Sequence, residues 1–400
     1  MIRAALVAVV LVAAVWGVLH VGWYGHGQIV DYGVYQRYGD KVVNEHAVPY
    51  RDFDLEYPPG ALPVFVAPSL VERFDYRKAF QTLMAVCLIA ASLGAFLIAG
   101  LRAAVLTAVA PLALGSVVLS RFDLWPATLT VLALAALLRR HPVLSGVLIG
   151  TAFAAKLWPA VLVPLLAIWI ARSDGGRAAG RWLAVAAATA AAWFLPFVIL
   201  SPGGVAHSFH AQFARPLQLE SLGASLLIAW HHLTAERLFV ESSYGSQNVI
   251  GPGTHAAAII TSVVGVLALA AVYVAFARRT PDVGDLLRYA AGAVAVTLAF
   301  GKVFSPQFLI WLFPLVPLVR GRRGIWASSL FFLALVLTQL WFPERYWPLA
   351  NYLAPTQSLE VLARNLAVVA LAAVLLLEHD VLREHRARVE ALEGVRGKVE

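Results

Sequence analysis

The sequence predicts an all-α polytopic membrane protein, and three observations support this class. Apolar residues make up 60% of the 400 residues and charged residues only 14%, whereas about a quarter of a soluble domain is charged. Apolar runs close to the length that spans a bilayer, about 20 residues, recur along the chain. Basic residues lie in short clusters between these runs, as orientation signals do. The formal net charge of +8 therefore does not indicate nucleic-acid binding.

Twelve apolar runs are candidate spans, and we expect about 12 transmembrane helices in a single domain, 1–400. The first run is interpreted as an uncleaved helix and not as a signal peptide, because more spans follow and no small-x-small cleavage site is evident. The short runs between 125 and 171 could form tilted or re-entrant helices. The candidate spans are 2–22, 79–100, 103–119, 125–138, 143–155, 157–171, 182–200, 255–276, 286–300, 303–319, 325–342 and 359–377.

The distribution of charge predicts the orientation of these spans. If the N-terminus is cytoplasmic and the spans alternate, the short arginine-rich loops face inward, as the positive-inside rule requires. The long loops then face outward, and 23–78 and 201–254 are the two largest. The tail, 378–400, alternates in charge and is predicted to continue the last span as a cytoplasmic helix. We expect a multi-pass protein of the plasma membrane with both termini cytoplasmic.

The first outer loop contains a carboxylate beside the bilayer. Asp31 follows the first span by a few residues, and a helical register would place it on one face with Tyr35 and Tyr38. A carboxylate at this level suits a general base. An ordinary solvated loop acid is an equally good interpretation of Asp31.

The same loop ends in a second acidic cluster. In the run 51–57, strand-like alternation would place Asp52, Asp54 and Glu56 on one side, beside Tyr57. Pro58, Pro59 and Gly60 then turn the chain back toward the membrane. Arg51 could pair with a neighbouring acid or hold a phosphate. A solvated turn is the alternative, although three acids within five residues are unusual for a loop.

Charged residues also interrupt the apolar runs at their outer ends. Arg121 and Asp123 separate two spans, Lys156 breaks the run 143–171, and Lys302 lies close to Gln307. Charges at membrane depth are costly and face a polar cavity or a partner. The competing interpretation for the lysines is snorkelling to the headgroups. Because phosphate groups bind clustered donors, these residues are candidates for a phosphate site.

Other motifs give little support for a metal or a nucleotide. His207 and His210 lie one helical turn apart in a stretch, 205–240, with helical periodicity that predicts an interfacial helix. Metal sites need three or four converging ligands, and no such spacing occurs, so we expect no metal. Neither a Gly-x-Gly-x-x-Gly loop nor a Walker pattern is present. The single cysteine, Cys87, permits no disulfide within the chain.

Several blocks together resemble one enzyme family. Pro49-Tyr50-Arg51-Asp52-Phe53, with Glu56-Tyr57-Pro58-Pro59-Gly60, follows an early Asp31. Arg121-Phe122-Asp123, Lys156-Leu157-Trp158-Pro159 and Lys302-Val303-Phe304-Ser305-Pro306-Gln307 come later, in consistent order over roughly 25–320. This set resembles glycosyltransferase family 87 of the GT-C superfamily, which includes polyprenol-phosphate-mannose-dependent α-mannosyltransferases of envelope lipoglycans.

The resemblance implies a GT-C fold with an outward-facing active site, a polyprenyl-phosphate sugar donor, and an inverting reaction that needs no metal or cofactor. The sugar is a hexose, with mannose as the family's default, and the acceptor is a lipid or glycan of the cell envelope. Asp31 takes the position of the catalytic carboxylate, and Asp52 or Glu56 would orient the acceptor. Lys302, together with Arg121, Lys156 or Arg51, is expected to bind the donor phosphate. Further candidate substrate contacts are Tyr35, Tyr57, Asp54, Asp123, Gln307 and His210.

Two other classes of function fit part of the sequence. A transporter or flippase for polyprenyl-linked lipids would explain the charges near the membrane, but the charges lie at outer span ends and no inverted repeat is visible. A non-catalytic protein of envelope assembly would tolerate substitution of the carboxylates. An oligosaccharide ligase of the same superfamily would differ only in the size of its donor.

Overall fold

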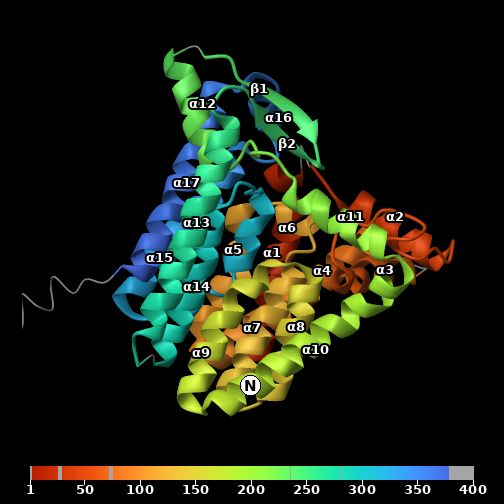
Figure 1. The fold of residues 1–400 in the computed structure, drawn as a ribbon, viewed down its shortest axis with the longest axis vertical. Coiled ribbons are helices and arrows are strands. Elements are labelled where there is room, and N and C mark those ends of the chain that lie inside the picture. The colour runs from red at the N-terminus through yellow and green to blue at the C-terminus, as the bar shows by residue number, and fades with distance from the viewer. Residues whose placement is uncertain (1, 26–28, 72–74, 235, 281, 378–400) are drawn as a thin grey trace, which may run out of the picture.

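The computed structural model describes residues 2–25, 29–71, 75–234, 236–280 and 282–377. The chain forms a helical bundle with a small β-hairpin at one end (Figure 1). The polytopic all-α class predicted from the composition is confirmed. The predicted cytoplasmic tail, 378–400, lies outside the described residues.

Each of the predicted spans coincides with a helical segment. Six helices in the described part of the chain are long and apolar enough to cross a membrane. They are α4 (Tyr76–Ala99), α10 (Gly176–Leu200), α13 (Thr254–Ala277), α14 (Val283–Phe300), α15 (Gly321–Trp341) and α17 (Pro355–Leu376). The shorter apolar segments are α1 (Ile2–Leu19), α5 (Leu101–Leu114), α7 (Leu124–Leu138), α8 (Pro142–Ala155), η3 (Trp158–Leu162) with α9 (Val163–Ser173), and η4 (Pro306–Leu312) with η5 (Val316–Leu318).

The helices differ in how much of their surface is buried. Helix α14 lies inside the bundle, with α13, α17 and α9 against it. Helices α10 and α13 instead leave most of their apolar side chains exposed, among them Ile199 and Val266. Large exposed apolar surfaces on long helices are the surfaces that lipid covers. These two helices therefore form the outside of the bundle.

The arginine-rich loops meet at one end of the bundle. Arg102 donates to the Val319 carbonyl at 3.2 Å, and Arg172 donates to the Arg279 carbonyl at 2.6 Å. Arg140 forms an ion pair of 2.7 Å with Asp174. The loops that charge assigned to the inner side are thus neighbours in space.

The long loops fold at the opposite end into elements of their own. Loop 23–78 contains η1 (Gly22–Gly25) at its start, then α2 (Tyr32–Val43), η2 (Pro59–Ala61) and α3 (Leu62–Ser69). Loop 201–254 contains α11 (Pro202–Phe213), α12 (Leu222–Thr234), β1 (Phe239–Ser243) and β2 (Ser246–Ile250). The short helices α6 (Val117–Ser120) and α16 (Tyr346–Tyr352) complete this end (Figure 1).

The predicted interfacial helix over 205–240 is wrong in extent. The helix breaks at 214–221, and its last residues enter the antiparallel hairpin of β1 and β2, in which Val240 pairs with Val249. Tyr244 and Gly245 both have positive φ, as a tight two-residue hairpin turn requires. The loop 214–221 is fastened to the hairpin by a bridge between Gln218 and Asn248. Loop and hairpin therefore form one unit.

The predicted strand over 51–57 is also wrong. A tight turn forms instead, in which Asp52 Oδ2 accepts from the Val48 N–H at 2.7 Å and Tyr50 has a φ of 67°. Asp52 also pairs with the side chain of Arg51 at 2.9 Å, on the exposed surface. The three acids consequently do not share a side: Asp52 and Asp54 are exposed, whereas Glu56 lines an internal cavity.

Candidate active site

A cavity of about 570 Å³ lies at the end of the bundle formed by the long loops. Its wall includes residues of α2, of the turn before α7, of the segment after α8, and of the loops around α11, β2 and η4. Segments far apart in the sequence thus enclose one space. The charged residues of the wall are Asp31, Glu56, Arg121, Asp123, Lys156, Arg215 and Glu220.

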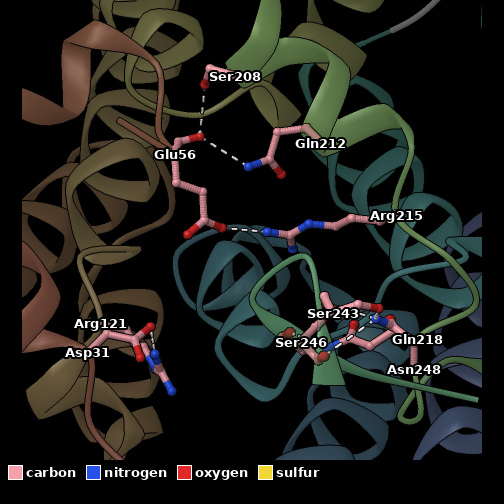
Figure 2. Close-up of polar contacts among 11 residues, drawn as sticks. Asp31, Glu56, Arg121, Ser208, Gln212, Arg215, Gln218, Ser243, Ser246 and Asn248 are labelled. Carbon is pink, nitrogen blue, oxygen red and sulfur yellow. Dashed lines mark hydrogen bonds and ion pairs between the residues drawn. The ribbon is translucent and has the colours of Figure 1, made fainter. Parts of the chain in front are cut away.

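The first charged pair joins Asp31 and Arg121 (Figure 2). Asp31 stands at the N-terminus of α2, and its side chain is 27% exposed. Arg121 is buried in the turn between α6 and α7, and its Nε has no hydrogen-bond partner among the described residues. The pair therefore combines an accessible carboxylate with a buried guanidinium whose Nε is unpaired.

The second pair joins Glu56 and Arg215 across the cavity wall (Figure 2). The backbone carbonyl of Glu56 accepts from Gln212 Nε2 at 3.0 Å and from Ser208 Oγ at 3.3 Å, so α11 is bound to the segment before Pro58. The Glu56 side chain is 34% exposed, and Arg215 Nε has no partner among the described residues. This pair resembles the first in having a partly exposed carboxylate and a largely buried guanidinium whose Nε is unpaired.

The third pair, Asp123 with Lys156, is enclosed. Asp123 Oδ1 accepts from Lys156 Nζ and from Trp311 Nε1, both at 2.6 Å, and the Asp123 side chain is 1% exposed. Lys156 Nζ also lies 4.9 Å, 5.1 Å and 5.5 Å from the ring centroids of Phe122, Phe308 and Trp311. Contacts of this kind stabilise a desolvated ammonium.

Glu220 is the fourth carboxylate of the wall and forms no ion pair among the described residues. It is buried, and its Oε2 has no hydrogen-bond partner in the described part of the chain. Its backbone carbonyl accepts from Arg364 at 2.8 Å and Asn365 at 3.1 Å. Burial raises the pKa of Glu220 from 4.5 to about 7, and the nearby charge of Arg364 and the hydroxyl of Tyr346 oppose that rise. Glu220 is thus a titratable group inside the cavity wall.

The block that contains Lys302 is held by Gln218. The Gln218 amide donates to Ser305 Oγ and accepts from the Phe304 N–H, both at 2.7 Å. The Gln218 N–H also donates to the Lys302 carbonyl at 2.9 Å. The Lys302 ammonium donates to the Phe213 carbonyl at 2.7 Å, and Lys302 does not line the cavity.

The structure brings together some of the sequence-predicted site residues and separates others. Those that line the cavity are Asp31, Tyr35, Glu56, Tyr57, Arg121, Asp123, Lys156 and Gln307. Those that do not line it are Arg51, Asp52, Asp54, His210 and Lys302. Arg51 and Asp52 pair with each other, and His210 is exposed on α11, so their positions follow from local turns and helix faces.

Sequence reasoning missed Arg215 and Glu220, which line the cavity from the loop 214–221. One signal was available: they are the only arginine and the only acid between 201 and 235. Such isolated charges in an apolar stretch indicate a polar environment. Gln218 and Tyr346 carried no comparable signal. Within the described residues, no three His, Cys, Asp or Glu side chains are grouped so as to hold a metal ion.

Comparison with solved structures finds weak resemblance over most of the chain. ArnT from Cupriavidus metallidurans, solved with undecaprenyl phosphate, is 16% identical with a TM-score of 0.49, and the match covers 92% of this chain and 77% of ArnT. The oligosaccharyltransferase AglB from Archaeoglobus fulgidus, in complex with an inhibitory peptide and a dolichol-phosphate, is 15% identical with a TM-score of 0.37, covering 97% and 52%. No curated protein sequence matches the chain.

A family model gives a direct assignment. The model of glycosyltransferase family 87 matches residues 55–306, which is more than half of the 400 residues. The matched segment contains six of the seven charged residues of the cavity wall, all except Asp31. On this evidence the chain belongs to glycosyltransferase family 87.

Proposed function

We propose that this membrane glycosyltransferase transfers a hexose from a polyprenyl phosphate to a hydroxyl of a lipid or glycan acceptor of the cell envelope. The proposed hexose is mannose. The observation that carries the proposal is the cavity wall, in which accessible carboxylates are paired with guanidinium groups. Transfer from a phosphate leaving group needs one base and cations that stabilise the departing charge. The proposal includes a GT-C architecture and a location in the plasma membrane. In this arrangement the cavity faces outward and both termini are cytoplasmic.

Asp31 is the proposed general base. It is an accessible carboxylate of the wall, 27% exposed. It takes the proton of the acceptor hydroxyl while the acceptor oxygen attacks the anomeric carbon from the side opposite the phosphate. The bond between the anomeric carbon and the phosphate oxygen breaks, and its electron pair leaves with the phosphate. The configuration at the anomeric carbon is therefore inverted.

Arg121 and Arg215 are the proposed phosphate ligands. Both arginines line the cavity, and the buried Nε of each has no partner among the described residues. Arginine suits this role because its planar fork donates two parallel hydrogen bonds to phosphate oxygens. A lipid phosphate is already a good leaving group, so no general acid is required.

The two roles are linked in the Asp31–Arg121 pair. Before the donor binds, Arg121 holds the Asp31 carboxylate. A phosphate that binds Arg121 competes with this carboxylate and releases it toward the acceptor. Donor binding would thus prepare the base.

Washed membranes that contain the protein test the proposal. A polyprenyl phosphate carrying radiolabelled mannose is added, and both the label in the lipid and glycan fractions and the release of polyprenyl phosphate are followed. We expect label transfer with equimolar release of polyprenyl phosphate. The proposal fails if the label moves only from a sugar nucleotide, or if the sugar-lipid crosses the membrane intact without release of the carrier.

A further inference from the structure

The enclosed pair of Asp123 and Lys156 differs from the other two pairs because its carboxylate is less free to leave its cation. Asp31 is 27% exposed and Glu56 is 34% exposed, so both carboxylates can turn into the cavity when an anion takes their arginine. Asp123 is 1% exposed and receives a second hydrogen bond from Trp311. Its carboxylate is therefore held more firmly than the carboxylates of the other two pairs.

A fixed carboxylate makes Lys156 a poor phosphate ligand. A phosphate at Lys156 Nζ would lie within a few ångströms of the Asp123 carboxylate, and like charges at such distances repel strongly where water is excluded. The pair as a whole is neutral and is 2.6 Å across. A neutral pair of this kind binds hydroxyl groups without this repulsion.

Aromatic rings surround the same end of the cavity. Trp158 and Trp311 stack with centroids 5.1 Å apart and planes 7° apart, and Phe308 stacks on Trp311 at 4.3 Å. All three residues line the cavity. Small-molecule sites typically combine such apolar and aromatic walls with a few placed polar groups that fix orientation. The C–H faces of a sugar ring suit these rings, and its hydroxyls suit the polar pair.

Two buried polar atoms in this region have no partner among the described residues: Asp123 Oδ2 and Trp158 Nε1. Buried unpaired polar atoms are rare and call for an explanation.

Lys156 is 16% exposed, so it is the member of the pair that reaches the cavity. Its ammonium has three donors, of which one is given to Asp123.

We infer that this end of the cavity is the sugar subsite, in which Lys156 donates to a hydroxyl of the transferred hexose and Asp123 is a positioning residue that fixes Lys156. The inference rests on the proposed function, because it assumes a sugar carried on a lipid phosphate. It assigns Lys156 to the sugar and not to the phosphate that the sequence had suggested. The subsite favours an uncharged, hydroxyl-rich hexose over an anionic one.

Inhibition by polyprenyl phosphate without a sugar separates the two roles. We expect Lys156→Met to leave the inhibition constant of polyprenyl phosphate within about twofold of the wild type. The same variant should lower kcat/KM for the mannosyl donor by about 10- to 100-fold, since a hydrogen bond to a charged group contributes about 1.5–3 kcal/mol. Lys302→Met is the matched control and should change neither quantity by more than a few fold. An increase of tenfold or more in the inhibition constant for Lys156→Met would overturn the inference.

A second measurement compares the wild-type protein and Lys156→Met with modified donors. Donors that lack one hydroxyl of the hexose at a time are compared by kcat/KM. We expect one position at which removal costs about tenfold or more, and Lys156→Met should be insensitive to that same removal. Equal kcat/KM for all the deoxy donors would overturn the sugar subsite. If sugar-free polyprenyl phosphate fails to inhibit even the wild type, the proposed donor is wrong, which is a different outcome.

Discussion

Gly60 lies in direct backbone contact with Ala154. A Cβ at Gly60 would be 2.6 Å from the Ala154 carbonyl carbon and 2.6 Å from the Ala155 nitrogen. The Gly60 carbonyl also accepts from Trp125 Nε1 at 3.1 Å. Helix α8 ends at Ala155 and Lys156 follows, so this contact sets the position of Lys156 against the first outer loop. Through this contact, the turn Pro58-Pro59-Gly60 helps to fix the position of Lys156 in the cavity wall.

Gly60→Ala should therefore damage both stability and activity. The added methyl group meets backbone atoms, which cannot rotate away, and overpacking of this kind costs about 1–3 kcal/mol. We expect a lower melting temperature in detergent and a reduced kcat. Gly180→Ala in α10 is the matched control, because nothing lies within 4 Å of a Cβ there. Equal melting temperatures and rates for the two variants would show that the contact is not needed.

The sequence predicted the spans well because hydrophobicity determines them. Each apolar run, including the short ones between 125 and 171, became a helical segment, since backbone groups in a bilayer must pair within their own segment. The outer loops were harder to predict. The alternation of acids over 52–56 indicated a strand, but Asp52 bonds to the Val48 N–H and forms a turn. Local side-chain-to-backbone bonds of this kind compete with regular structure.

Part of the candidate site was predicted because a charge interrupted an apolar run. Arg121, Asp123 and Lys156 stood out for that reason, and all three line the cavity. Lys302 stood out equally, yet its ammonium donates to the Phe213 carbonyl and it does not line the cavity. Glu220 lies in a loop whose position depends on pairing with the hairpin, a long-range relationship that no local pattern encodes.

Asp31→Asn should abolish most turnover while the protein still folds. Loss of a positioned base reduces rates by about a hundredfold or more. The amide retains the shape of the side chain, so inhibition by polyprenyl phosphate should persist. Asp52→Asn is the control: Arg51 holds the pKa of that exposed carboxyl at about 2, and Asp52 does not line the cavity. Label transfer from the mannosyl donor measures both variants. If Asp52→Asn loses turnover and Asp31→Asn keeps it, the base is misassigned.

Lys302→Ala should lower stability and turnover only modestly, because it loosens the loop 213–218. The substitution removes one hydrogen bond to the Phe213 carbonyl, which contributes about 1.5–3 kcal/mol at most because the donor is charged. We expect a small fall in melting temperature, turnover within a few fold, and an unchanged inhibition constant for polyprenyl phosphate. Should that constant rise tenfold or more, Lys302 binds the donor phosphate as the sequence suggested.

Glu220 should make stability depend on pH. Burial raises its pKa to about 7, so the folded state keeps the proton that the unfolded chain loses from about pH 4.5 upward. The contribution of Glu220 to the free energy of unfolding is full below about pH 4.5 and is lost as the pH rises through about 7. This change in the free energy of unfolding is on the order of 3 kcal/mol, at ~1.4 kcal/mol per pKa unit. Arg364, Arg121 and Tyr346 are the groups that face it.

Melting temperatures of wild type and Glu220→Gln between about pH 5 and 8 test this dependence. Glutamine keeps the shape without the proton equilibrium, so the variant should lose less stability than the wild type as pH rises. Glu241→Gln, at an exposed position of β1, should behave as the wild type does. Parallel curves for wild type and Glu220→Gln would exclude Glu220 as the titrating group.

Glu56 and Arg215 should affect phosphate binding in opposite directions. In the empty cavity the Glu56 carboxylate occupies the Arg215 guanidinium, and a donor phosphate has to displace it. Glu56→Gln removes this competitor and should tighten inhibition by polyprenyl phosphate by about threefold, since a partly exposed ion pair contributes up to ~1 kcal/mol. Arg215→Ala should weaken the same inhibition, and Arg215→Lys should restore part of it, because the charge returns without the planar fork. Asp54→Asn is the control, since Asp54 is exposed and does not line the cavity. If Glu56→Gln and Arg215→Ala both weaken inhibition, the pair holds α11 in place and does not bind the phosphate.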